Sequence, residues 1–504
     1  MTTNRSCAFF AALLAVPGAF AVSCDSLTGL KLPNTTITRA DSVVAGGFEA
    51  PKLPPPQQAM FKRLPAFCRV AAEIKPTPDS DIKMEVWLPA ENWNGKFMGT
   101  GNGGWSGSIV YPSLASGVSH GYATASTNTG HDGVDATFAI DHPEKLVDFG
   151  WRAVHEMTVK GKAITEAFYS KGPERSYWNG CSSGGKQGLK EAQKFPLDYD
   201  GIVAGAPANY WTHLMVGDLW PAIVTSKEPA AALPPAKLQV LHKAAMEACD
   251  SLDGVKDGLI EDPTRCHFDP AAVQCKGEEN ETCLTAAQVA AARKIYEGAK
   301  NPRTGESIFP GMSRGSELVW PALAGERPFG IPVSHFQVVV FKNPDWNFLT
   351  LDFDKDVALA DKIDNGLLNA TDPNLKAFFA HGGKLLMYHG WNDQLISPFN
   401  SVNYYTSVVK AMGGVAKIND SYRLFMAPGM NHCNGGDGPS RIDVVTTIDD
   451  WVTHGRAPDQ LLAEHVAAGG HVDRSRPLCP YPQVAKYKGT GSIDDAASFT
   501  CAKP

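Results

Sequence analysis

Short apolar segments recur along the chain at spacings typical of β-strands, and helical patterns lie between them. The strand pattern occurs at residues 84–88, 96–98, 122–125, 176–178, 201–205, 384–388 and 422–426. A helical pattern covers residues 185–194, directly after one of these strands. Strands that alternate with helices in this way predict an α/β fold with a largely parallel sheet.

This alternation of strand and helix patterns is interrupted between residues 208 and 345. Prolines, glycines, aspartates and four cysteines accumulate there, and the clearest helical pattern is at Lys237 to Cys249. The interruption predicts a lid domain at 208–345, inserted into a catalytic domain made of residues 22–207 and 346–504. A chain of 504 residues with 43% hydrophobic content is long enough for such an arrangement.

The charge balance limits the choice of partners. The formal net charge is −7 and the isoelectric point is near 6.1. A mild acidic excess argues against nucleic acid or an anionic membrane surface as the main partner. No segment after the N-terminus reaches the roughly 18 apolar residues of a membrane span.

Residues 1–21 have the pattern of an export signal. Arg5 supplies the positive start, an apolar stretch follows, and Ala19-Phe20-Ala21 resembles a small-x-small cleavage site. We therefore expect an extracellular or periplasmic protein. Cys24 leaves a lipoprotein anchor as an alternative, but Ala21 stands where such signals usually have a larger aliphatic residue.

Ten cysteines remain once the signal and Cys7 are removed. They are Cys24, Cys68, Cys181, Cys249, Cys266, Cys275, Cys283, Cys433, Cys479 and Cys501. An even number in an exported chain indicates disulfide bonds. Spacing favours three local pairs, Cys249–Cys266, Cys275–Cys283 and Cys479–Cys501.

The segment Gly180-Cys181-Ser182-Ser183-Gly184 is the leading candidate for a catalytic site. A Gly-x-Ser-x-Gly string is weak by itself, because both residue types are common in loops. Here a strand pattern precedes it and a helical pattern follows it, which is the setting of a nucleophile elbow. Ser182 is therefore the predicted nucleophile.

A serine nucleophile needs a base and an orienting carboxylate, and strand ends supply both. Asp393 follows the strand at 384–388, and His432 follows the strand at 422–426. The order Ser, Asp, His is that of the α/β-hydrolases. His389 and His454 compete with His432 as the base but do not follow an apolar strand in this order. Asp437 competes with Asp393 but comes after the histidine.

Two cysteines adjoin these candidates. Cys181 precedes Ser182, and Cys433 follows His432. A bond between them would tether the elbow to the histidine loop and limit drift of the proton-transfer geometry. Two buried free thiols are the alternative, and export favours the disulfide.

These motifs resemble those of the tannase and feruloyl esterase family of α/β-hydrolases. The resemblance rests on Cys181-Ser182, Asp393 and His432-Cys433, with matching context in 180–185, 388–393, 428–433 and 480–482. It implies a secreted serine carboxylesterase that hydrolyses aromatic acyl esters, with feruloyl esters as the leading substrate. Tannase activity on galloyl esters and hydrolysis of mono(2-hydroxyethyl) terephthalate are the alternatives. Small phenolic esters, free or linked to plant polymers, would be the substrates.

The resemblance also implies two further sites. Backbone N–H groups of Gly104 and Ser183 would form an oxyanion hole. A structural Ca²⁺ would bind in the aspartate-rich loop after Cys249. Its ligands would be the side chains of Asp250, Asp253 and Asp257 and the main-chain carbonyls of Val255 and Leu259. A non-catalytic, calcium-stabilised binding protein is the competing class, and the intact Ser, Asp and His argue against it.

Overall fold

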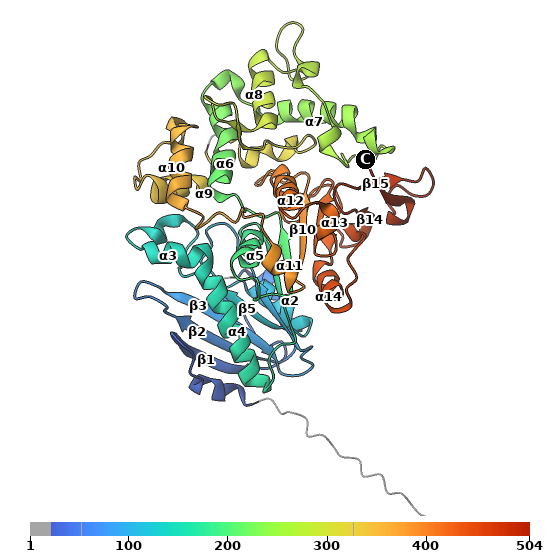
Figure 1. Cartoon of the computed structure of the whole chain (residues 1–504). Coiled ribbons are helices and arrows are strands. Elements are labelled where there is room, and N and C mark those ends of the chain that lie inside the picture. Colours follow the sequence, from blue (N-terminus) through green and yellow to red (C-terminus); the bar gives the residue numbers. More distant parts are fainter. Residues whose placement is uncertain (1–21, 52, 326) are drawn as a thin grey trace, which may run out of the picture.

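The computed structural model describes residues 22–51, 53–325 and 327–504 (Figure 1). The predicted export signal lies outside the described residues. Within them, a large mixed sheet with helices on both faces forms the lower part of the molecule in Figure 1, and a mostly helical region lies above it. The predicted α/β fold is confirmed.

Nine strands form the central sheet, in the order β1-β2-β3-β5-β4-β6-β7-β10-β11. Their bounds are β1 Thr35–Val43, β2 Phe67–Ile74, β3 Ile82–Pro89, β4 Lys96–Thr100, β5 Ala123–Thr127, β6 Arg175–Cys181, β7 Gly201–Gly205, β10 Lys384–Gly390 and β11 Tyr422–Ala427. The six strands from β5 to β11 in this order pair in parallel, whereas β1, β2 and β3 form an antiparallel edge. Every residue of β5, β7 and β11 is buried, as expected for parallel strands covered on both faces.

The antiparallel edge was only partly predicted from sequence. Sequence patterning placed the start of the sheet near Asp81, but β1 and β2 precede it. In β2 buried and partly exposed residues alternate over most of its length, as in a strand with one face against the core. The disulfide between Cys24 and Cys68 ties this edge to the N-terminal segment.

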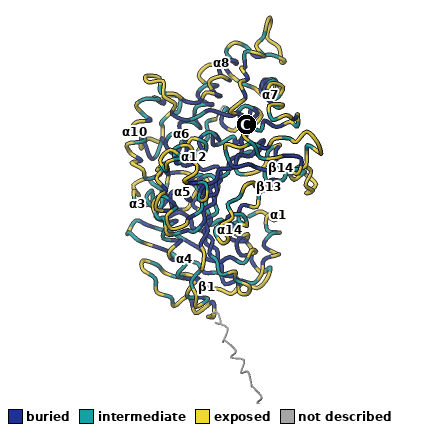
Figure 2. The backbone as a smooth tube through the Cα atoms, turned by 45° about the vertical axis from the view of Figure 1, so that its right-hand side comes forward, coloured by how far each residue is buried: buried dark blue, intermediate teal, exposed yellow. Residues whose placement is uncertain are grey.

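Helices cover both faces of the sheet. On one face lie α4 Ala153–Tyr169, α5 Ser183–Lys194, α11 Lys376–Ala380 and α12 Phe399–Ala411. On the other face lie α2 Tyr111–Ser119 and α14 Val444–His454. Short helices α1 Pro55–Gln58, α3 Pro143–Val147 and α13 Val415–Ile418 complete this part. Figure 2 shows the buried backbone running through the sheet between these helices.

The region between β7 and α11 is mostly helical and includes the predicted lid. It contains α6 Trp211–Ser226, α7 Pro235–Cys249, α8 Ala286–Glu297, α9 Gly330–Ser334, α10 Lys355–Asp364, and the short strands β8 Ala299–Lys300 and β9 Ser307–Phe309. The helix predicted at 237–249 is confirmed as part of α7. Beyond the predicted lid boundary at 345, Leu351, Val357 and Ala360 share one apolar cluster with α6. Helix α10 therefore packs with α6.

The chain ends in two small antiparallel sheets. One contains β12 Arg441–Ile442, β13 Leu461–Val466 and β14 Val472–Leu478, and the other β15 Val484–Tyr487 and β16 Phe499–Ala502. All ten predicted disulfide cysteines are paired, as Cys24–Cys68, Cys181–Cys433, Cys249–Cys266, Cys275–Cys283 and Cys479–Cys501. Among the described residues, none of the helices is both long and apolar enough to cross a bilayer.

Candidate active site

Ser182 lies in a tight turn between β6 and α5. Its backbone has φ 63° and ψ −125°, a conformation that residues with a side chain rarely adopt. A Cβ atom on Gly180 would lie only 2.5 Å from the Gly184 carbonyl oxygen, so the turn requires glycine there. The Ser182 N–H donates to the Gly205 carbonyl over 2.9 Å and anchors the turn to the end of β7. A strained serine held in this way is typical of a nucleophile elbow.

Asp393 lies three residues after β10 and is completely buried. One carboxylate oxygen accepts the backbone N–H groups of Leu395 and Ile396 over 2.8 and 2.9 Å. The other oxygen accepts from His432 Nδ1 over 2.8 Å. Burial by itself would raise the pKa of Asp393, but His432 and His389 beside it hold that pKa well below its usual value. Asp393 is therefore an ionised carboxylate aimed at His432.

The position of the hydrogen on His432 follows from this contact. An ionised carboxylate only accepts hydrogen bonds, so Nδ1 of His432 carries the hydrogen. Nε2 is then left with a free lone pair, which is what a general base needs. The backbone N–H of His432 donates to Gln394 Oε1 over 3.0 Å and fixes the loop beside Asp393.

His389 is a second partner of Asp393. Its Nε2 lies 3.0 Å from Asp393 Oδ2 and 3.1 Å from the Ile396 carbonyl, and both of these atoms are acceptors. Its Nδ1 is hydrogen-bonded to the Ser401 hydroxyl over 2.7 Å. His389 was a competitor for the base in the sequence, but it is completely buried and directed at the carboxylate. His389 therefore orients Asp393. Its position in the sequence, at a strand end and four residues before the aspartate, could have indicated this role.

Ser182 and His432 line one cleft of about 490 Å³. Its walls also include the Gly101–Gly104 loop, Leu395, and Ile331 from the lid. In the part of the chain that the structure describes, no hydrogen bond joins the Ser182 hydroxyl to the imidazole, and such bonds are often long in free enzymes. A larger hollow of about 780 Å³ over β1–β3 contains none of the three predicted catalytic residues.

The predicted oxyanion-hole residues lie side by side next to Ser182. The Ser183 hydroxyl donates to the Gly104 carbonyl over 2.9 Å, which joins the glycine loop to α5. Ser183 is the first residue of α5, where backbone N–H groups have no partner within the helix. Neither its N–H nor that of Gly104 donates to any residue described in the structure. Both donors are free for an oxygen in the cleft.

Two further side chains position this loop, and sequence patterns did not identify them. Gln187, on α5, accepts the backbone N–H of Asn102 over 3.1 Å. The Asn102 amide donates to the carbonyls of Ser108 and Thr127, each over 2.9 Å. The loop is thus fixed to the helix that begins after Ser182. Asn102 lies in the predicted glycine-rich loop, but its partners are distant in sequence.

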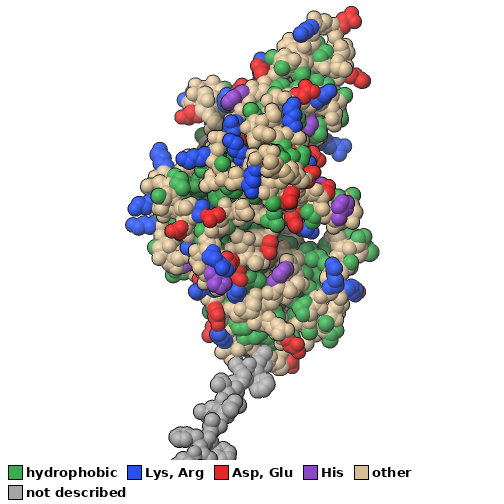
Figure 3. Space-filling view, turned by 90° about the vertical axis from the view of Figure 1, so that its right-hand side faces the viewer, with side chains coloured by type: hydrophobic (Ala, Val, Ile, Leu, Met, Phe, Trp, Pro, Cys, Tyr) green, Lys and Arg blue, Asp and Glu red, His purple; other side chains and the backbone are tan. Residues whose placement is uncertain are grey.

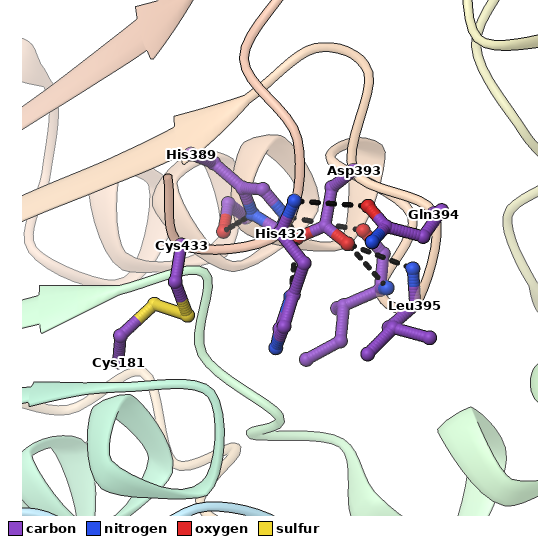
Figure 4. The surroundings of a disulfide bond; sticks show 9 residues. Cys181, His389, Asp393, Gln394, Leu395, His432 and Cys433 are labelled. Carbon is purple, nitrogen blue, oxygen red and sulfur yellow. Dashed lines mark hydrogen bonds and ion pairs between the residues drawn. A yellow bond between two sulfur atoms is a disulfide. The ribbon is translucent and has the colours of Figure 1, made fainter. Parts of the chain in front are cut away.

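The disulfide between Cys181 and Cys433 joins the elbow to the histidine loop. The two Cα atoms are 6.0 Å apart. Figure 4 shows His432 between this disulfide and Asp393, with His389 behind it. The bond therefore holds the segments of Ser182 and His432 at a fixed separation.

The predicted calcium ligands lie on one loop between α7 and Cys266. The Asp250 carboxylate accepts the N–H groups of Asp257 and Gly258, and Asp253 accepts that of Val255. Burial raises the pKa of Asp253 to about 6. The loop also contacts two other parts of the chain. Asp257 pairs with the buried Arg476 of β14.

The other end of this loop contacts the histidine loop. The Leu259 side chain lies directly against Gly429, three residues before His432. The aspartate-rich loop therefore connects the lid, the C-terminal sheet and the segment that carries the base.

Comparison with known proteins shows clear relatives. The family model for tannase and feruloyl esterase matches residues 68–502. An uncharacterized esterase of Xanthomonas campestris pv. campestris is 37% identical over 547 residues, covering 99% of this chain and 94% of the relative. A probable feruloyl esterase B-2 of Aspergillus terreus is 36% identical over 518 residues, covering 97% of each chain. The crystal structure of feruloyl esterase B from Aspergillus oryzae has a TM-score of 0.90 and 33% identity, covering 95% of this chain and 99% of that one.

Proposed function

The chain belongs to the tannase and feruloyl esterase family of carboxylic ester hydrolases, and from this premise we propose that it hydrolyses feruloyl esters with Ser182, His432 and Asp393 as its triad. The observation that carries the proposal is the 2.8 Å contact between His432 Nδ1 and Asp393. It leaves Nε2 of His432 free in the cleft that also holds the strained Ser182.

In the proposed mechanism His432 Nε2 takes the hydroxyl proton as Ser182 Oγ attacks the ester carbonyl carbon. Asp393 stabilises the imidazolium that forms. The tetrahedral intermediate collapses when His432 protonates the leaving alcohol, which leaves an acyl-serine. Water then attacks this acyl-enzyme with His432 again as base, and the acid and free Ser182 are released.

The negative oxygen of the tetrahedral intermediate would be bound by the N–H groups of Gly104 and Ser183. Neither N–H group donates to another described residue, which supports this role, because oxyanion donors must be available and already oriented. The N-terminal end of α5 adds a favourable dipole at the same place.

Relatives named feruloyl esterase B support a hydroxycinnamoyl group as the acyl part of the substrate. The uncharged cleft walls formed by Ile331 and Leu395 suit a planar apolar ring. Figure 3 shows acidic and basic side chains interspersed over one face of the molecule. A highly charged polymeric substrate would instead favour a large patch of the opposite charge. Galloyl esters and the terephthalate half-ester are the alternatives.

A substrate panel separates these alternatives. The values of kcat/KM for methyl ferulate, methyl gallate and mono(2-hydroxyethyl) terephthalate would be compared for the mature protein. We expect the highest value for methyl ferulate. A higher value for methyl gallate would assign tannase activity and would reject the feruloyl assignment.

Covalent labelling tests the nucleophile. A fluorophosphonate should label the wild type and should not label Ser182→Ala, which should also lose ester hydrolysis. Ser113→Ala is the matched control, because Ser113 lines the same cleft but lies on α2, outside the turn that carries Ser182. Labelling that persists in Ser182→Ala would refute the assignment. A wild type that is neither labelled nor active would favour the non-catalytic binding protein.

The aspartate-rich loop is proposed to bind a structural Ca²⁺. Its donors are hard oxygens, from the side chains of Asp250, Asp253 and Asp257 and the carbonyls of Val255 and Leu259, which suits this ion. Burial raises the pKa of Asp257 as well as that of Asp253. Arg476 forms an ion pair with Asp257. Bound calcium would stiffen the junction of lid and histidine loop without joining the reaction.

Calcium removal provides the test. EGTA should lower the thermal midpoint of the wild type, and added Ca²⁺ should restore it. Asp253→Asn should weaken this response, whereas Glu278→Gln, at an exposed lid position, should not. If neither EGTA nor Ca²⁺ changes the thermal midpoint of the wild type, the proposed calcium site is wrong.

Secretion is proposed as well. Five disulfides are typical of an oxidising compartment, and residues 1–21 have the pattern of an export signal. N-terminal sequencing of the protein from culture medium or periplasm should begin at Val22.

A further inference from the structure

Three side chains from separate segments meet beside the far end of α5. His155 comes from the first turn of α4, Glu191 from the last turn of α5, and Asp198 from the segment before β7. Each contributes one nitrogen or oxygen atom to a group whose members all lie within 4.8 Å of one another. The three aspartates of the proposed calcium loop are not part of this group. No step of the proposed esterase reaction uses it.

Glu191 is the unusual member of the group. Its side chain is 1% exposed, and neither carboxylate oxygen has a hydrogen-bond partner in the described part of the chain. A buried carboxylate without a partner costs several kcal/mol in folding free energy unless a positive charge or a proton neutralises it. A ligand that supplies positive charge would remove this cost.

The other two members are arranged to share such a ligand. His155 Nδ1 lies 2.7 Å from Asp198 Oδ2. The imidazole is stacked on Phe195, with ring centroids 3.7 Å apart and an interplanar angle of 9°, so its orientation is fixed. The side chains of His155 and Asp198 are 26% and 16% exposed. The group is therefore partly open to solvent through His155 and Asp198.

The positive charge of Lys162 acts on Glu191, but the Lys162 ammonium is hydrogen-bonded elsewhere. Its ammonium donates to the main-chain carbonyl of Asp198 and lies 5.5 Å from the centre of the Tyr199 ring. Burial lowers the pKa of Lys162, so its positive charge is itself disfavoured there. Among the described residues, therefore, no hydrogen bond or ion pair joins the Glu191 carboxylate to a cation.

We propose that His155, Glu191 and Asp198 bind a divalent first-row transition metal ion of the Zn²⁺ class. One imidazole nitrogen with two carboxylates is a donor set that such ions accept, with water in the remaining position. The all-oxygen calcium loop differs in this respect, because it lacks a nitrogen donor.

The position of the site defines its role. Glu191 is about 12 Å along α5 from Ser183, at the 1.5 Å rise per residue of an α-helix. Metal bound there would join α5 to α4 and to the segment that leads into β7. It would stabilise the helix that carries the nucleophile at its other end without touching the reacting atoms.

The test uses the full mature chain, stripped by a chelator and then saturated with Ca²⁺ to fill the loop site. Titration with Zn²⁺ by calorimetry should show one equivalent, and the thermal midpoint should rise by several degrees. Co²⁺ in place of Zn²⁺ should give visible absorption bands that report nitrogen and oxygen ligation.

Two variants and a matched control decide the outcome. Glu191→Gln keeps the shape of the side chain and should weaken Zn²⁺ binding at least tenfold, as should His155→Gln. Glu156→Gln, next to His155 but paired with Lys160, should bind as the wild type does. Equal Zn²⁺ binding by Glu191→Gln and wild type would overturn the proposal.

Absence of any Zn²⁺-dependent rise in the wild-type midpoint would also overturn the proposal, and would mean that Glu191 is neutralised by a proton. Activity on methyl ferulate is measured separately, so failure of this site and failure of the proposed esterase function are distinguishable.

Discussion

Cys181 and Cys433 form a disulfide that joins the residue before Ser182 to the residue after His432. The two cysteines are 252 positions apart in the sequence. The bond therefore fixes the separation of two loops that would otherwise be positioned only by the packing of their strands. Proton transfer depends steeply on such separations.

Removing this disulfide should affect activity as well as stability. The double variant Cys181→Ser/Cys433→Ser should lose about 2–4 kcal/mol of unfolding free energy, because a long loop is released, and its kcat should fall. Cys275→Ser/Cys283→Ser is the control, since those cysteines are only 8 positions apart on the lid. Chemical denaturation and kinetics on methyl ferulate would be measured for both. A Cys181→Ser/Cys433→Ser enzyme with wild-type kcat would show that the bond serves stability alone.

Asp393→Asn should lower kcat by about 10³ to 10⁴-fold. The amide can donate to His432 Nδ1, so the imidazole would carry its hydrogen on Nε2 and could not accept the Ser182 proton. Asp437→Asn is the matched control, because Asp437 is exposed and follows the base in sequence. Single-turnover kinetics measure the acylation rate directly. If both variants acylate at similar rates, Asp393 is not the orienting carboxylate.

Gly101→Ala should separate the glycine loop from the elbow. The added Cβ would lie 2.4 Å from Gly184 Cα, a backbone atom that cannot move without displacing α5. Loss of one oxyanion donor costs about 10² to 10³-fold in kcat, and we expect a decrease of this size. Gly103→Ala, whose Cβ would meet nothing within 4 Å, should have a much smaller effect. Similar kinetics for the two variants would argue against this loop as the oxyanion hole.

His335→Phe should make the protein less sensitive to acid. Burial, together with the positive charge of Lys186, lowers the pKa of His335 to about 3. Protonation therefore occurs first in the unfolded chain, near pH 6.5. His335 destabilises the folded state as pH falls from 6.5 towards 3, by about 1 kcal/mol per pH unit.

Thermal midpoints of His335→Phe and wild type, measured from pH 7 to pH 4, provide the check. The two curves should be closest at pH 7 and should diverge in favour of the variant as pH falls. Parallel curves over this range would mean that His335 takes up its proton at the same pH in the folded and unfolded chains.

The parts of the fold that local patterns encode were predicted well. Buried parallel strands have continuous apolar segments, so β6, β7, β10 and β11 were recognisable, and helix α5 followed from its spacing. Strands β1 and β2 were missed, because at the exposed antiparallel edge β1 is mostly polar and its pairing with β2 is set by contacts along the whole strand. The packing of α10 against α6 was likewise not indicated by local patterns, because the two helices are far apart in sequence.

Sequence alone indicated Ser182, Asp393 and His432 as the candidate triad, because each follows an apolar strand and such strand ends meet at one edge of a parallel sheet. It also determined the adjacent Cys181 and Cys433. Only the tertiary structure decided that His389 supports Asp393, that Gln187 holds the glycine loop, and that His155, Glu191 and Asp198 meet. These contacts join residues that are distant in sequence, and the pattern around one residue gives no sign of its partner. They form because folding brings distant segments together, and polar groups buried at these junctions require hydrogen-bond or ionic partners.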